Sequence, residues 1–114
     1  MSDPFKNLQV HYKKGEIVYR DGDKANVMFI VNKGEVKLFK KDSTDQQIDL
    51  GHYGKGDIFG ERAVVEGGLR SETAVANEDS ILLVLNRDMF MTLIKKNPEI
   101  AVKMIHKFAA RLQE

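Results

Sequence analysis

The sequence predicts a mainly β protein in which short strands form a sandwich or barrel, with two helices at the C-terminal end. Nine glycines punctuate the first 68 residues, and the runs between them are too short for helices. Several of these runs alternate apolar and polar residues with a period near two, as half-buried strands do. After about residue 86 the apolar period becomes helical. We therefore expect strands over about residues 9–85 and helices over about 87–96 and 98–113.

The strands are placed by turns and by alternation. Val36 to Phe39 and Gln47 to Leu50 change sides residue by residue, and Asn32-Lys33-Gly34-Glu35 reads as a hairpin turn in which Gly34 adopts positive φ. Many short strands with close turns are typical of a sandwich or barrel. The strand-like runs are 16–19, 27–32, 35–39, 46–52, 73–77 and 80–85.

Two helix starts follow. Asn86 is suited to cap a helix that has Asp88 in its first turn, and Asn97-Pro98-Glu99 combines a cap, a first-position proline and an acid. We expect the apolar face of the last helix to pack on the strands; the alternative is a homodimer through the same helix of a second chain. The apolar faces contain Met89, Phe90, Leu93 and Ile94, and then Ile100, Ala101, Met104, Ile105, Phe108, Ala109 and Leu112.

Composition excludes several classes of protein. The length fits one domain, residues 1–114. Eighteen basic and seventeen acidic residues give a formal charge of +1, so no general attraction to nucleic acid is expected. The absence of cysteine excludes disulfides and thiolate metal sites. No signal peptide and no apolar run of membrane-spanning length are found, so we expect a cytoplasmic protein.

The segment from Gly56 to Ala74 contains the residues that indicate a ligand-binding site. Gly60 lets the backbone approach a ligand closely, and the residues from Glu61 to Val65 have the composition of one helical turn whose N–H groups suit an anion. Arg70, just before a strand, carries a fork of donors that matches phosphate oxygens. A carboxylate, a helix start and an arginine in one loop suit a ligand with a hydroxyl and a phosphate.

This segment resembles the phosphate-binding cassette of cyclic-nucleotide-binding domains. Asp21-Gly22-Asp23 and Gly34-Glu35-Val36 resemble the early turns of the same family, and residues 97–113 resemble the helix of bacterial catabolite-activator relatives. The resemblance implies an antiparallel β-roll (a jelly roll or double-stranded β-helix) with a short cassette helix and two C-terminal helices. The matching cassette residues are Phe59, Gly60, Glu61, Ala63, Val64, Val65, Arg70 and Ser71.

The resemblance also implies roles for the ligand-binding set. Glu61 accepts a hydrogen bond from the ribose 2′-hydroxyl, and Arg70 pairs with the exocyclic phosphate oxygens. The backbone N–H groups of Glu61 to Ala63 and of Ser71 help to hold the phosphate, and Ser71 can also donate its hydroxyl. The set is Gly60, Glu61, Arg62, Ala63, Arg70 and Ser71.

Two residues depart from the family pattern. Arg62 stands where Leu or Met is frequent, and Glu72 stands where a small residue is usual. Glu72 would repel a phosphate if it pointed inward. Strand alternation can turn it away from the side of Ser71, and we expect a solvated surface acid.

The function implied is non-catalytic binding of a cyclic nucleotide, with cyclic AMP favoured over cyclic GMP, in a regulatory sensor acting on an unidentified effector protein or domain. No catalytic residue, metal or cofactor is expected, and no DNA binding by this chain. One alternative is a degenerate β-roll that acts as a protein-interaction domain. Another is a metal-dependent cupin enzyme, which the spacing of His11, His52 and His106 disfavours, because no two of them form a metal-ligand motif.

Overall fold

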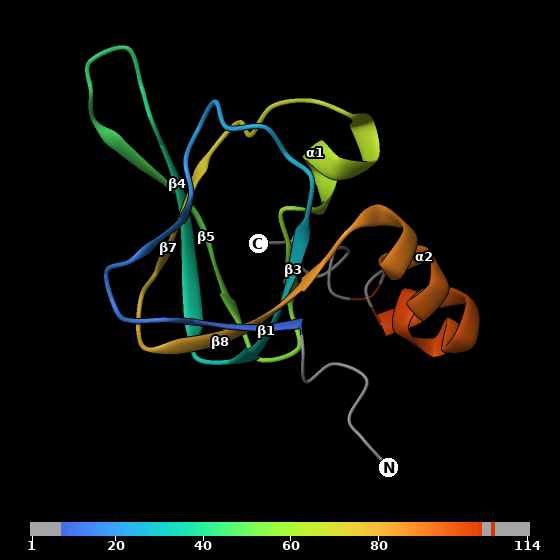
Figure 1. The fold of residues 1–114 in the computed structure, drawn as a ribbon. Helices are drawn as coiled ribbons and strands as arrows, with labels where there is room; N and C mark the ends of the chain where they lie inside the picture. Colours follow the sequence, from blue (N-terminus) through green and yellow to red (C-terminus); the bar gives the residue numbers. More distant parts are fainter. Residues whose placement is uncertain (1–7, 104–105, 107–114) are drawn as a thin grey trace.

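Two four-stranded sheets face each other in the computed structural model, which describes residues 8–103 and 106 (Figure 1). Neighbouring strands in both sheets are antiparallel, which confirms the predicted antiparallel β-roll. The first sheet has the order β1 (Gln9–Tyr12), β8 (Ser80–Leu85), β3 (Met28–Lys33), β6 (Ile58–Phe59). The second has the order β2 (Ile17–Tyr19), β7 (Thr73–Ala76), β4 (Glu35–Lys41), β5 (Gln47–Gly54).

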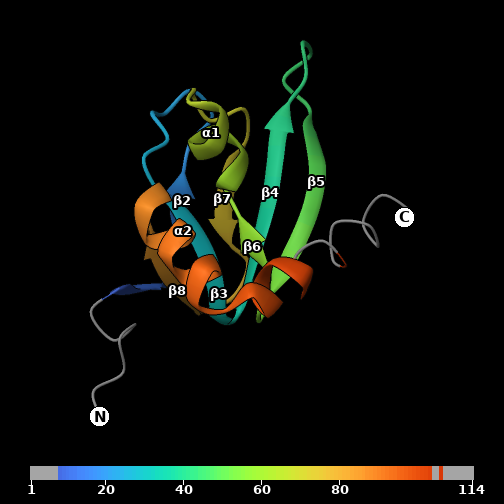
Figure 2. The ribbon, with the colours of Figure 1, turned by 90° about the vertical axis from the view of Figure 1, so that its right-hand side faces the viewer.

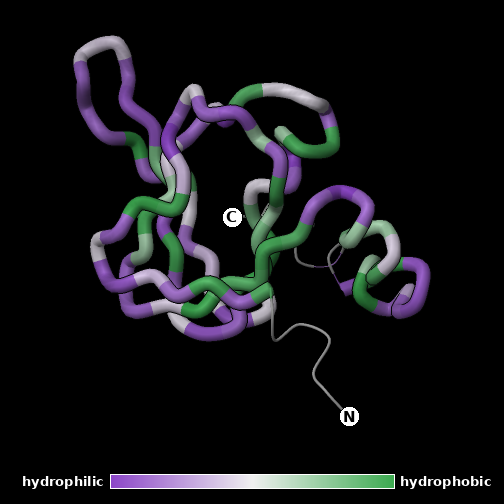
Figure 3. The backbone as a smooth tube through the Cα atoms, in the orientation of Figure 1, coloured by the Kyte–Doolittle hydropathy of each residue, from purple (hydrophilic) through white to green (hydrophobic). Residues whose placement is uncertain are grey.

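The core lies between the sheets, where the inward side of each strand is apolar. Val36 and Leu38 of β4 pair with Ala76 and Ala74 of β7, and all four side chains are buried. Ala74 belongs to the same core cluster as Phe29 and Phe59, which come from the other sheet. The β4–β5 hairpin extends beyond this core and its tip is hydrophilic (Figure 3).

The predicted strands are confirmed to within two residues at every end, and the largest differences are the longer C-terminal ends of β4 and β5. Gly34 adopts the expected positive φ, 95°. The predicted hairpin is wrong, because β3 and β4 on either side of this turn lie in different sheets and do not pair with each other. Strands β1 and β6 have no counterpart among the predicted runs. β6 has only two residues, Ile58–Phe59, which is too short for alternation to be visible.

Helices α1 (Glu61–Glu66) and α2 (Arg87–Lys96) both agree with the prediction. Asn86 caps α2, because its Oδ1 accepts a hydrogen bond of 2.8 Å from the Met89 N–H. In Figure 2, α2 lies beside β3 and β8, while α1 lies near the upper end of the β-roll. Residues 98–103 and 106 are helical. The predicted apolar positions Met104, Ile105, Phe108, Ala109 and Leu112 lie outside the described residues.

Across residues 8–103 and 106, the helices are too short or too polar to cross a bilayer.

Gly60 sets the direction in which α1 starts. It occupies the N-cap position with φ 75°, in the left-handed region that favours glycine. A Cβ added at this position would lie 2.9 Å from Arg70 Nη1 and 3.3 Å from ring atoms of Phe29 and Tyr19. The residue therefore has to be glycine both for its backbone angle and for the space above Arg70.

We predict that Gly60→Ala destabilises the domain by at least about 1 kcal/mol, because alanine is strained at this φ and its methyl group collides with Arg70. Gly68→Ala is the matched control, since a Cβ there meets nothing within 4 Å. Urea unfolding of the two variants measures the difference. Equal stabilities would contradict the assigned role of Gly60.

His52 joins two carboxylates at the exposed surface of β5. Its Nδ1 lies 2.6 Å from Glu35 Oε1 and its Nε2 lies 2.9 Å from Asp49 Oδ2. Hydrogen bonds to Glu35 and then Asp49 raise the pKa of His52 above 6.5. The hydrogen bond with His52 is also the largest cause that lowers the pKa of Glu35 below 4.5.

This triad should stabilise the fold in a limited pH window. The histidine contribution is complete below its ordinary pKa of 6.5 and is lost as the pH rises through its raised pKa. The Glu35 contribution is complete above 4.5 and is lost as the pH falls through its lowered pKa. We predict that His52→Gln lowers the melting temperature between pH 4.5 and 6.5 and has little effect at pH 9. An identical loss at both pH values would contradict this.

Candidate functional site

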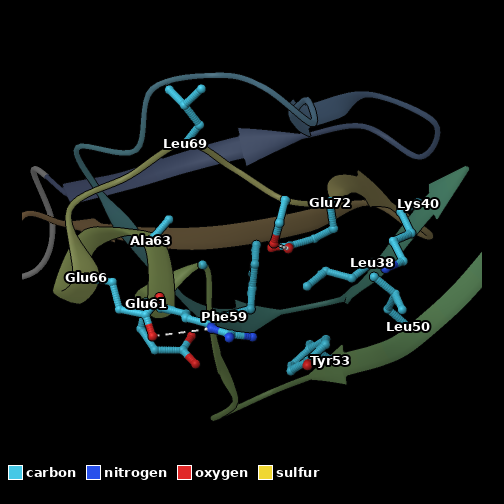
Figure 4. Close-up of a pocket in the computed structure, with 13 residues that line it drawn as sticks. Leu38, Lys40, Leu50, Tyr53, Phe59, Glu61, Ala63, Glu66, Leu69 and Glu72 are labelled. Atoms are coloured by element: carbon cyan, nitrogen blue, oxygen red, sulfur yellow. Dashed lines mark hydrogen bonds and ion pairs between the residues drawn. The ribbon is translucent and has the colours of Figure 1, made fainter.

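A pocket of about 520 Å³ lies between α1 and the sheet that contains β4, β5 and β7 (Figure 4). Five of the six predicted ligand-binding residues line it: Gly60, Glu61, Arg62, Ala63 and Ser71. The fold therefore brings the start of α1 and the residue after Arg70 to one cavity, as the cassette resemblance implies.

The opposite wall was not predicted. Leu38 and Lys40 of β4 and Leu50 and Tyr53 of β5 line it, at the end of the pocket away from Glu61 and Ala63 (Figure 4). The alternation of β4 places Leu38 and Lys40 on its inward side. The alternation is visible in the sequence, but it does not distinguish inward side chains that line a pocket from those that pack in the core.

Arg70 lies beneath the pocket instead of lining it. Its side chain is only 4% exposed. Nη1 donates a hydrogen bond of 2.6 Å to the carbonyl of Gly60, and Nη2 donates to the carbonyl of Val27. A buried guanidinium needs such partners, because removing a cation from water is costly.

The third nitrogen of this guanidinium, the buried Nε of Arg70, has no hydrogen-bond acceptor among the described residues. A buried donor without an acceptor costs about 1–3 kcal/mol. The arginine is held by two backbone carbonyls, which carry no charge, so an anion next to Nε would supply both the missing acceptor and the missing negative charge.

The aromatic floor under Arg70 was also not predicted. The Arg70 Cζ lies 4.1 Å from the ring centroid of Tyr19, within the range of a cation–π contact. Tyr19 packs on Phe29, which stacks on Phe59, with centroid separations of 5.9 and 5.1 Å. The rings come from three strands, so no local pattern could have revealed their assembly.

The backbone of Arg70 is fixed to the turn that follows β2. Its N–H donates to the Asp23 carbonyl, and its carbonyl accepts from the Gly22 N–H, both at 2.8 Å. Gly22 adopts φ 93°, so this turn depends on glycine. The resemblance of Asp21-Gly22-Asp23 to the family's early turn thus has a physical meaning, since the turn anchors the cassette arginine.

The start of α1 faces the same pocket. The first N–H groups of a helix have no intrahelical partners and favour an anion. Arg62, in the first turn, lies 3.5 Å from Glu66 Oε1 in an exposed i,i+4 pair. This exposed ion pair contributes little to stability, and the Arg62 side chain stays solvated at the pocket rim.

The expectation that Glu72 faces solvent is wrong. Glu72 is half-buried and lines the pocket. Its Oε1 accepts a hydrogen bond of 2.8 Å from the Tyr19 hydroxyl, and its Oε2 accepts one of 2.7 Å from the Ser71 hydroxyl. The residue precedes β7 on the same side as buried Arg70 and Ala74, so alternation turns it inward instead of outward.

Burial and the neighbouring Glu72 carboxylate raise the pKa of Tyr19 well above its usual range. The Tyr19 hydroxyl therefore stays protonated and acts as a donor to Glu72 at physiological pH. One tyrosine thus connects the two opposite charges of the site, with Arg70 against its ring and Glu72 at its hydroxyl.

Known proteins match this chain over most of its length. Residues 9–97 match the family model described as "Cyclic nucleotide-binding domain". A cyclic AMP receptor protein from Thermus thermophilus is 35% identical over 103 residues, which are 90% of this chain and 48% of that protein. The chain thus spans about half the length of that relative.

Solved structures agree in fold. The catabolite activator protein of Thermus thermophilus superposes with a TM-score of 0.77 at 33% identity, over 92% of this chain and 49% of that chain. An EAL enzyme, solved in a cAMP-bound form, superposes with a TM-score of 0.69 at 25% identity, over 91% of this chain and 28% of that chain. Since the family match covers the whole β-roll and the cassette, this chain belongs to the cyclic nucleotide-binding domain family.

Proposed function

We propose that this domain binds a cyclic nucleoside monophosphate without chemical conversion, with cyclic AMP favoured over cyclic GMP, and that it acts as a regulatory sensor. The observation that carries the proposal is the buried Arg70, whose Nε has no acceptor among the described residues and which lies directly under the start of α1. A cyclic phosphodiester carries one negative charge, and one arginine with helix-start amides matches that charge.

The phosphate would lie between Arg70 and the N–H groups of Glu61, Arg62 and Ala63. Gly60 supports this placement, because its missing side chain brings the backbone within reach of the guanidinium. The carbonyls of Gly60 and Val27 hold Nη1 and Nη2, so Nε is the guanidinium nitrogen that is left for the phosphate. Because the guanidinium is buried, it has to become accessible from the pocket when the ligand binds.

The ribose and the base would occupy the rest of the pocket. Glu61 lines the cavity beside the phosphate position and is proposed to accept the ribose 2′-hydroxyl. The apolar wall of Leu38, Leu50 and Tyr53 offers a surface for a purine. About 520 Å³ falls in the range of small-molecule pockets.

Two points support cyclic AMP as the preferred ligand. The Thermus thermophilus relative is named as a cyclic AMP receptor. The Ser71 hydroxyl, which could otherwise anchor a guanine, is already donated to Glu72. The EAL enzyme has been solved in both a cAMP-bound and a cGMP-bound form, so both ligands have to be compared directly.

As a sensor, the domain would couple binding to its helices. We propose that ligand orders α1 and shifts α2 and the helix after it, with an effect limited to the ligand's differential affinity for the two arrangements.

We predict that the wild-type domain binds cyclic AMP one-to-one and that Arg70→Lys weakens binding at least tenfold, about 1.4 kcal/mol, by removing the fork and its Nε donor. Glu61→Gln should also weaken binding, through the ribose contact. Calorimetric titration with cyclic AMP and cyclic GMP gives the affinities and their ratio.

Arg87→Lys is the matched control. Arg87 is exposed on α2, so this substitution makes the same chemical change away from the pocket. Circular dichroism confirms that each variant is folded. If folded wild type binds neither nucleotide, the function proposed here fails and the protein-interaction alternative is favoured. If Arg70→Lys and Arg87→Lys bind equally well, Arg70 is not the residue that binds the phosphate.

A further inference from the structure

The charges of the pocket are balanced, which is unexpected for a site that should hold an anion. Three acidic side chains face it or line its rim, and three basic ones lie in or directly beneath it. A pocket without one of these acids would carry a net positive charge and would attract a cyclic phosphate more strongly. The acids are Glu61, Glu66 and Glu72, and the bases are Lys40, Arg62 and Arg70.

Glu72 is connected to Arg70 through Tyr19. Its carboxylate is bonded to the hydroxyl of Tyr19, whose ring lies 4.1 Å from the Arg70 Cζ. Glu66, by contrast, lies in an exposed pair with Arg62 at the rim. A charge that is half-buried is screened less by salt and solvent than an exposed one, so Glu72 acts more strongly on Arg70 and on any anion beside it.

Glu72 also occupies a donor that the ligand would use. The Ser71 hydroxyl donates to Glu72 Oε2 at 2.7 Å, so this hydroxyl has to leave the carboxylate before it can donate to a phosphate. The carboxylate thus acts in two ways, by repelling the anion and by holding a donor that would otherwise bind it.

We propose that Glu72 is an affinity-setting residue: an internal acidic competitor that lowers the affinity of this pocket for the cyclic phosphate. The proposal rests on the function proposed above. It means that the domain responds at higher ligand concentrations than its cassette alone would allow. Because the phosphate is common to both nucleotides, the repulsion by Glu72 weakens the binding of both cyclic AMP and cyclic GMP, and its hold on the Ser71 hydroxyl adds to the loss for cyclic GMP.

A purely structural role of Glu72 leads to the opposite expectation. If the carboxylate served only to hold Tyr19 under Arg70, then weakening that hydrogen bond would loosen the arginine and reduce affinity. Glu72→Gln separates the two roles, because the amide oxygen still accepts from the Tyr19 hydroxyl while the negative charge is removed.

The test is calorimetric titration of wild type, Glu72→Gln and Glu78→Gln with cyclic AMP and cyclic GMP at 50 and 500 mM salt. Glu78→Gln is the matched control, because it makes the same change of net charge at an exposed turn after β7. Glu72→Gln should bind about three- to thirtyfold tighter than wild type at low salt, and the gain should shrink at high salt. Glu78→Gln should bind within about twofold of wild type.

Each outcome decides the proposal. Tighter binding by Glu72→Gln alone supports it, including the case in which only this variant binds measurably. Unchanged or weaker binding by Glu72→Gln, with wild type binding normally, overturns the competitor role and leaves the proposed function intact. A gain that does not depend on salt overturns its electrostatic origin. If neither folded wild type nor Glu72→Gln binds, the proposed function fails and this inference fails with it.

Discussion

The burial of the Arg70 guanidinium is the constraint on which the site depends. A cation that is 4% exposed has to be held by carbonyls, aromatic faces or anions. Here two carbonyls and the Tyr19 ring hold it, and each comes from a different part of the chain. The αL glycine at position 60 follows from this, because a side chain there would enter the space of the guanidinium. The β-roll therefore serves as a frame that fixes one arginine beneath a helix start.

Glu72 imposes a second constraint, because its charge is opposite to that of Arg70. A carboxylate inside the same pocket is tolerated because it receives hydrogen bonds from Tyr19 and Ser71, which offset part of its loss of hydration. Tyr19 carries the arginine on its ring and the carboxylate at its hydroxyl, and burial keeps that hydroxyl protonated. On the inference above, the balance between these charges sets how strongly the pocket attracts an anion.

Much of the fold and of the candidate site could be predicted from the sequence, because turns, alternation and the cassette spacing are local patterns. The positive φ of Gly34, the cap at Asn86 and the gathering of Glu61 and Ser71 at one cavity all follow from such patterns. The turn at Gly34 connects the two sheets instead of forming a hairpin, because the sheet to which each strand belongs is set by long-range pairing. The aromatic floor could not be predicted, since Tyr19, Phe29 and Phe59 meet only through the sheet packing. Glu72 was misplaced for a related reason: the phase of alternation is fixed by where Arg70 is buried, which the sequence does not state.

The central claim is that Arg70 Nε is the donor that receives the cyclic phosphate, and NMR can observe this donor directly. The Nε–H resonance of Arg70, assigned by its absence in Arg70→Lys, would be followed during a titration with cyclic AMP. A hydrogen bond to phosphate should shift this proton strongly downfield and protect it from exchange with water, together with a change in the phosphorus resonance of the ligand. If resonances of other pocket residues move to saturation while the Arg70 Nε–H stays unchanged, the arginine is a structural element of the β-roll and the phosphate is held elsewhere.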